Sequence, residues 1–111
     1  MRMQIAALAV LATSPALAQW RALSGPKIAG ALSERKLVHE GAWQQFEVSD
    51  RTHYNAGSDS WGKWRAEGHQ YCSQWPPAGG WACYAIARDD DTGALRFEGE
   101  SGDLTVGHYA K

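Results

Sequence analysis

The sequence predicts a mainly β fold, a small antiparallel β-barrel or sandwich built as a meander, with one short N-terminal helix and one disulfide. From Lys36 onward, short segments rich in β-branched and aromatic residues recur at spacings of about eight to twelve residues, separated by clusters of Gly, Asn, Asp and Pro. Two cysteines, Cys72 and Cys83, flank one of these clusters. Short strands joined by short turns favour antiparallel neighbours over an α/β fold.

Residues 1–18 have the form of a cleavable export signal. Arg2 supplies a positive charge, residues 5–12 form an uncharged apolar run, and Ala16-Leu17-Ala18 provides the small residues that a signal peptidase accepts. A retained amphipathic helix would need a polar face, which residues 5–12 lack. We therefore expect cleavage after Ala18 and a periplasmic or secreted product, a single disulfide-containing β domain of residues 19–111.

The charge balance and the apolar pattern exclude two classes of partner. The chain has 11 basic and 12 acidic side chains, a net charge of −1, and shows no basic stripe. Binding through phosphate neutralisation requires a basic excess, so we expect no nucleic-acid partner. After the signal, no segment approaches the roughly 20 apolar residues of a membrane helix, so we expect no membrane span.

A short helix is predicted near the start of the domain. Ser24 is a suitable N-cap, and Pro26 fits the first helical turn because its missing N–H is not needed there. Ile28 and Leu32 lie four residues apart and therefore share one face. We expect one or two turns, ending near Ser33.

The strands are assigned from alternation and the turns that bound them. Pro76-Pro77-Ala78-Gly79-Gly80 sustains neither a ladder nor a helix and must be a loop. Ser49-Asp50, Gly68-His69 and the polar run 89–93 are predicted as turns. We expect a loose start at 19–23 and strands at 37–39, 43–48, 51–54, 61–67, 70–75, 81–88, 94–98 and 104–109.

Cys72 and Cys83 are predicted to form a structural disulfide between neighbouring strands. They are the only cysteines, and exported proteins favour disulfides. Their spacing is not that of a C-x-x-C redox pair, and no other cysteine completes a zinc set. A closed loop of this length contributes about 2 to 3 kcal/mol. Trp81 shares the face of Cys83, so we expect it to cover the disulfide in the core.

Several short strings resemble a known group of bacterial proteins. They are Ile28-Ala29-Gly30, Gly62-Lys63-Trp64, Tyr71-Cys72-Ser73-Gln74-Trp75 and Trp81-Ala82-Cys83-Tyr84. Together they resemble small exported proteins typical of alphaproteobacteria, the domain-of-unknown-function families of the 995 type. The resemblance implies a short helix followed by a β meander and a periplasmic location. It implies no catalytic residues, because no chemistry is assigned to the group.

Catalytic and metal-binding patterns are weak. No two of the four histidines, His39, His53, His69 and His108, have a spacing that places them side by side on one element. The acidic run 89–93 does not match the EF-hand pattern. We therefore assign no catalytic residue, metal ligand or cofactor. A small hydrolase or metal-dependent enzyme remains an alternative, with this acidic run or with His53 and Asp59 beside Ser58 or Ser60.

The aromatic content suggests a binding role. Six tryptophans exceed what a core of this size needs, and Trp61 and Trp64, three residues apart in a strand, should face opposite sides. Exposed Trp and Tyr are favoured at contacts because they offer a large, stiff surface with a polar atom. We expect a non-enzymatic module that binds an envelope protein, a cell-wall glycan or a small amphiphile. The alternatives are an aromatic set packed entirely in the core and a structural or stress-related envelope protein. The candidate binding residues are Trp61, Trp64, Tyr71, Trp75 and Trp81.

Overall fold

Nine strands and one helix form the part of the chain that the computed structural model describes, residues 19–111. The predicted export signal and its cleavage after Ala18 lie outside the described residues. In order, the elements are β1 (Trp20–Ala22), α1 (Gly25–Leu32), β2 (Lys36–His39), β3 (Ala42–Phe46), β4 (Arg51–Asn55), β5 (Asp59–Glu67), β6 (Gln70–Gln74), β7 (Trp81–Asp89), β8 (Leu95–Glu98) and β9 (Leu104–Tyr109).

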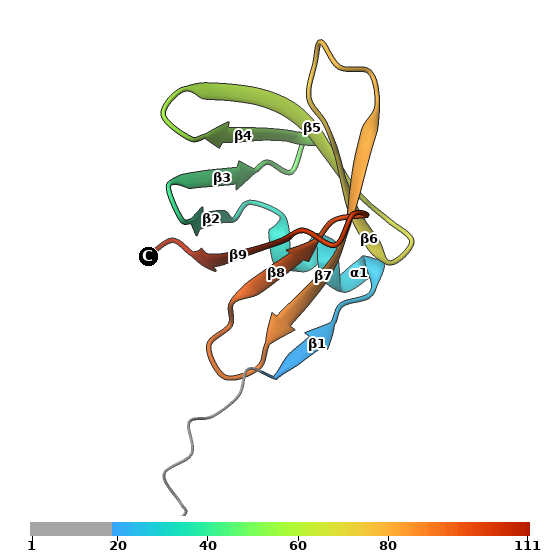
Figure 1. The fold of residues 1–111 in the computed structure, drawn as a ribbon, viewed down its shortest axis with the longest axis vertical. Helices are drawn as coiled ribbons and strands as arrows, with labels where there is room; N and C mark the ends of the chain where they lie inside the picture. Colours follow the sequence, from blue (N-terminus) through green and yellow to red (C-terminus); the bar gives the residue numbers. More distant parts are fainter. Residues whose placement is uncertain (1–18) are drawn as a thin grey trace, which may run out of the picture.

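Strands β2 to β9 close into an antiparallel barrel (Figure 1). Each strand pairs with the next along the chain, and β9 returns to pair with β2 through Leu37 with Tyr109 and Val38 with His108. The predicted mainly β meander is confirmed, and of the two architectures considered it is the barrel. Closure removes the free edges that an open sheet of these strands would expose.

The start of the described chain is a strand, where the sequence predicted a loose segment. β1 runs alongside the end of β7 (Figure 1), with Trp20 opposite Asp89 and Ala22 opposite Ala87. The first part of β7 pairs with β6 through the same edge. Beyond the end of β6, that edge of β7 pairs with β1 instead. The prediction for residues 19–23 was wrong because the partner strand lies far along the chain, beyond any local pattern.

Helix α1 closes one end of the barrel. Ile28, Ala31 and Leu32 are buried against the inward-facing side chains. Tyr109 in β9 fastens the end of the helix, since its hydroxyl donates a 2.7 Å hydrogen bond to the carbonyl oxygen of Ala31. Ser24 precedes the helix as predicted, but its backbone carbonyl accepts from Ile28 and its side chain makes no capping bond.

The predicted strands agree with the observed ones to within two residues at each end. The largest discrepancies are the end of β3 and the start of β5. The chain leaves β3 after Phe46 because Glu47 already donates to Arg51 across the turn, where Asp50 has a φ of 69°. The turns at Gly68-His69 and at residues 76–80 lie where the sequence placed them.

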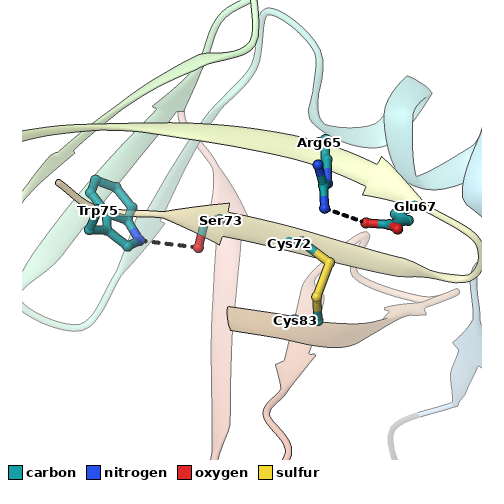
Figure 2. The surroundings of a disulfide bond; sticks show 6 residues. All are labelled: Arg65, Glu67, Cys72, Ser73, Trp75 and Cys83. Carbon is teal, nitrogen blue, oxygen red and sulfur yellow. Dashed lines mark hydrogen bonds and ion pairs between the residues drawn. A yellow bond between two sulfur atoms is a disulfide. The ribbon is translucent and has the colours of Figure 1, made fainter. Parts of the chain in front are cut away.

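The disulfide joins β6 to β7, as predicted, but on the outer face of the barrel. Cys72 and Cys83 are directly opposite each other on the two strands (Figure 2). The adjoining pair, Tyr71 with Tyr84, faces inward. The expectation that Trp81 covers the disulfide in the core was therefore wrong. Cys72 is nevertheless only 1% exposed. On the same face, Arg65 of β5 pairs with Glu67 and lies 4.0 Å from the centre of the Trp81 ring.

Burial of the inward-facing side chains changes along the barrel axis. Near α1 they form a closed core, with Leu37 and Phe46 fully buried. At the other end, Ser60, Ala82 and Thr105 also face inward, opposite Tyr54, Ser73 and Phe97 respectively, but all three are exposed. The barrel is therefore a cup, filled at the helix end and open at the other.

Candidate binding site in the mouth of the barrel

A cavity of about 1470 Å³ occupies the open end of the barrel. Small-molecule sites in proteins commonly measure roughly 300 to 1000 Å³, so there is room for an organic ligand. Aromatic rings and uncharged polar groups share the wall inside the barrel. The aromatic lining residues inside the barrel are Tyr54, Tyr71, Trp75, Tyr84 and Phe97, and the polar ones are Gln44, Ser60, Ser73 and Thr105.

The aromatic wall is held by ring-to-ring contacts. Tyr71 stands at its centre, with its ring centroid 5.4 Å from that of Phe97 in an edge-to-face contact and 5.8 Å from that of Tyr84. Tyr54 and Trp75 meet edge to face at 6.0 Å nearer the opening. Such contacts fix the orientation of the rings, so the wall is preformed.

Trp75 lies at the opening because a glycine makes room for it. Its indole packs on Gly62 of β5, and its Nε1–H donates a 3.1 Å hydrogen bond to the hydroxyl of Ser73 (Figure 2). Trp75 comes directly after β6, where the chain enters the loop at 76–80 that projects beyond the other strands (Figure 1). The indole thus lines the mouth with its polar atom already satisfied.

An uncharged hydrogen-bond network forms the floor of the cavity. The side-chain amide of Gln44 donates to Thr52 Oγ1 at 2.9 Å and to the hydroxyl of Tyr71 at 3.0 Å. Thr52 in turn donates to the carbonyl oxygen of Gln45. Burial raises the pKa of Tyr71 to about 12, so its hydroxyl stays protonated at neutral pH. The floor therefore offers hydrogen bonds without charge.

A slot between β2 and β9 extends the cavity to the side. The two strands pair only at Leu37 and Val38, and residues 104–106 of β9 have no partner on β2. His39 fills the narrow end of the slot: its Nδ1–H donates to the carbonyl oxygen of Val106 at 3.3 Å, and its ring packs on Gly107. Burial lowers the pKa of His39, so the imidazole is neutral at physiological pH.

The five predicted binding residues divide between the two faces of the barrel. Trp64 and Tyr71 point inward and are buried, at 6% and 3% exposure, while Trp75 lines the mouth. Trp61 and Trp81 lie on the outer face, Trp61 with 43% exposure at the rim of the cavity. The prediction that Trp61 and Trp64 face opposite sides is confirmed. The five do not form one continuous surface.

An outer row of aromatic rings crosses β3, β4 and β5. The imidazole of His53 stacks on Trp61 with ring centroids 4.1 Å apart, and it meets Trp43 edge to face at 4.7 Å. Lys36 lies over the Trp43 ring and Arg51 over the Trp61 ring, at 4.2 Å and 4.3 Å. The sequence showed the residues but not the row, because their adjacency depends on strand register.

The structure brings together only some of the residues of the catalytic alternative. His53 Nε2 lies 2.8 Å from Asp59 Oδ1, and the same oxygen accepts a 2.7 Å bond from Asn55. These bonds lower the pKa of Asp59. Ser60 faces the lumen, on the opposite side of β5 from Trp61 and hence from His53. Within residues 19–111, no hydrogen bond joins a serine to His53.

The acidic turn at 89–93 uses its carboxylates for structure. Asp89 accepts from the amide of Asp91 and the hydroxyl of Thr92, and Asp90 forms a salt bridge with Arg21 of β1. Across residues 19–111, no group of three His, Cys, Asp or Glu side chains is close enough to hold a metal ion.

Comparisons with protein-family models, with curated proteins and with solved structures found no match for this chain. The helix that the described residues contain is too short to cross a membrane.

Proposed function

We propose that this chain is an exported, non-enzymatic binding protein that holds a small amphiphile in the mouth of its barrel. One observation carries the proposal: the open end holds a solvent-open cavity of about 1470 Å³ with aromatic rings in its wall and an uncharged polar floor. Concave sites that combine apolar rings with a few placed hydrogen-bond groups are typical of small-molecule binding. Of the partners expected from the sequence, an envelope protein, a cell-wall glycan or a small amphiphile, we retain the amphiphile.

The same strands that form the core also hold the proposed site. Tyr71 packs against Phe46 of the closed core with ring centroids 5.7 Å apart, and it lines the cavity with the rest of its surface. The β6–β7 ladder sets the register of the strands that carry Ser73 and Tyr84, and the disulfide cross-links the same strands. A ligand would thus meet a wall ordered in advance, which lowers the entropic cost of binding.

A neutral fluorescent probe, N-phenyl-1-naphthylamine, tests the proposal in the oxidised protein. We expect its fluorescence to rise and to saturate at one probe per chain. Thr105→Trp, which places an indole in the lumen, should weaken binding at least tenfold because Thr105 is an exposed, inward-facing lining residue. Ala85→Trp is the matched control, since Ala85 lies on the outer face of β7. Absence of saturable binding, or equal loss in both variants, would refute the proposal.

A further inference from the structure

In the described part of the chain, the carboxylates in the cavity lining have no lysine or arginine beside them in that lining. Among the described residues that line the cavity, Glu40 and Asp59 are acidic and none is a lysine or an arginine. The two lining histidines are His39 and His108. Because burial keeps His39 neutral, the slot between β2 and β9 gains no positive charge from it at neutral pH.

Both carboxylates are available as negative charges at the rim. Glu40 lies in the turn between β2 and β3, and within residues 19–111 it forms no salt bridge. Asp59 begins β5 and stays ionised, because hydrogen bonds from Asn55 and His53 lower its pKa. The rim is therefore acidic at neutral pH.

The basic side chains on the neighbouring strands lie on the outer face of the barrel, where Arg51 reaches Trp61 at the rim. Lys36 begins β2 and Arg51 begins β4, so both are at the α1 end of their strands, and each rests on an outer-face tryptophan. Glu40 follows the end of β2, and Asp59 is reached from the end of β4. These two basic groups thus lie outside the cavity lining, which among the described residues includes two carboxylates and no lysine or arginine.

Aromatic faces and carboxylates favour the same kind of ligand group. Ring faces attract cations through their quadrupole, and the best-known biological use is the recognition of quaternary ammonium groups by aromatic cages. Tyr54 and Trp75 face the lumen near the opening, and Asp59 lies at the rim on the outer side of β5, where it contacts His53. An anionic headgroup there would meet two like charges, and no lysine or arginine among the described residues of the cavity lining would offset them.

From this arrangement we infer that the mouth selects an organic cation, an amphiphile with an ammonium-type headgroup, over an anionic amphiphile of the same shape. The inference rests on the proposed function. The apolar part of the ligand lies along the inner rings, and the cationic head lies at the rim beside Glu40 and Asp59.

Displacement of bound N-phenyl-1-naphthylamine by matched competitors tests this selectivity. Decyltrimethylammonium and decyl sulfate have the same chain and opposite charge, and both are used below their micellar concentrations at neutral pH. We expect the cation to displace the probe at concentrations at least tenfold lower. Circular dichroism recorded in parallel confirms that neither competitor unfolds the protein.

The rim carboxylates are tested by substitution. Glu40→Gln combined with Asp59→Asn should abolish most of the tenfold preference while the protein still binds the neutral probe. Glu98→Gln combined with Glu100→Gln makes the same change in net charge at exposed residues outside the cavity lining, and it should preserve the preference.

Two results separate this inference from the proposed function. If the probe binds but both competitors displace it equally, or if both double variants behave alike, the charge selectivity is wrong and the binding function stands. If the probe does not bind at all, the proposed function itself fails.

Discussion

The indole of Trp75 lies against the backbone of Gly62, so closely that a Cβ atom built on the glycine would be 2.6 Å from Cε3 of the ring. The carbonyl oxygen of Gln74 is 2.5 Å from the same position. Gly62 does not have a positive φ, so this strand position requires glycine for space and not for backbone conformation. Because Gly62 has no side chain, the indole can lie against β5 at the mouth.

Gly62→Ala should therefore destabilise the protein and displace Trp75. Overpacking of this kind costs about 1 to 3 kcal/mol, measurable as a lower free energy of unfolding in urea. Gly30→Ala is the control, because Gly30 has nothing within 4 Å of its Cβ position and lies in α1. There we expect a gain of about 0.5 to 1 kcal/mol from helix propensity. Equal stability of Gly62→Ala and the parent protein would contradict this packing.

The buried hydroxyl of Tyr71 should make stability fall at high pH. Its pKa is raised to about 12 in the folded state, against 10.0 for an unperturbed tyrosine, so the folded state retains the proton longer. The stabilisation that comes from this raised pKa is fully present below pH 10 and is lost as pH rises through 12. Tyr71→Phe should show a flatter decline in this window. Urea unfolding at a series of alkaline pH values measures it, and parallel curves for the two proteins would contradict it.

His39 should make the stability of the protein fall at low pH. Burial lowers its pKa below the ordinary 6.5, so the unfolded state binds the proton more readily. This contribution is present above pH 6.5 and is lost as pH falls through the folded-state pKa. Melting temperatures between pH 7.5 and acidic pH should fall less for His39→Gln than for the parent protein. His69→Gln, in the exposed turn between β5 and β6, serves as the control and should follow the parent.

Removal of the disulfide should cost stability without disturbing the lumen. Cys72 and Cys83 are 11 residues apart, and a loop of that size predicts a loss of about 2 to 3 kcal/mol when both become serine. Because the disulfide lies on the outer face, binding of N-phenyl-1-naphthylamine should survive below the melting temperature. Loss of binding in a variant that circular dichroism shows to be folded would mean that the bond also shapes the cavity.

Local patterns were sufficient to predict most of the strands. β9 was predicted at its observed bounds. Polar and glycine residues precede this alternating segment and mark where the strand begins. The disulfide followed from two cysteines on either side of a loop that can form no ladder. Both conclusions depend on residues within about a dozen positions of one another, which is the range over which turn chemistry and alternation act.

Features that depend on distant pairing were not accessible from the sequence. β1 is a strand only because β7 lies beside it, and barrel closure depends on β9 meeting β2. Alternation correctly separated Trp61 from Trp64, but it does not say which face is inside. For that reason the sequence does not show that the disulfide lies on the outer face. It also does not show that Trp75 faces the lumen while Trp81 lies outside.

The arrangement of partners around β7 has a consequence for how the molecule opens. β7 bonds to β8 on one edge, and to β6 and then β1 on the other. If β1 peels away, Ala87 and Asp89 lose their partners on one edge, yet the barrel stays closed because β8 still holds the other. Amide hydrogens of β1 can therefore exchange with solvent through a local fraying event. Those in the centre of β7 can exchange only when the barrel itself comes apart.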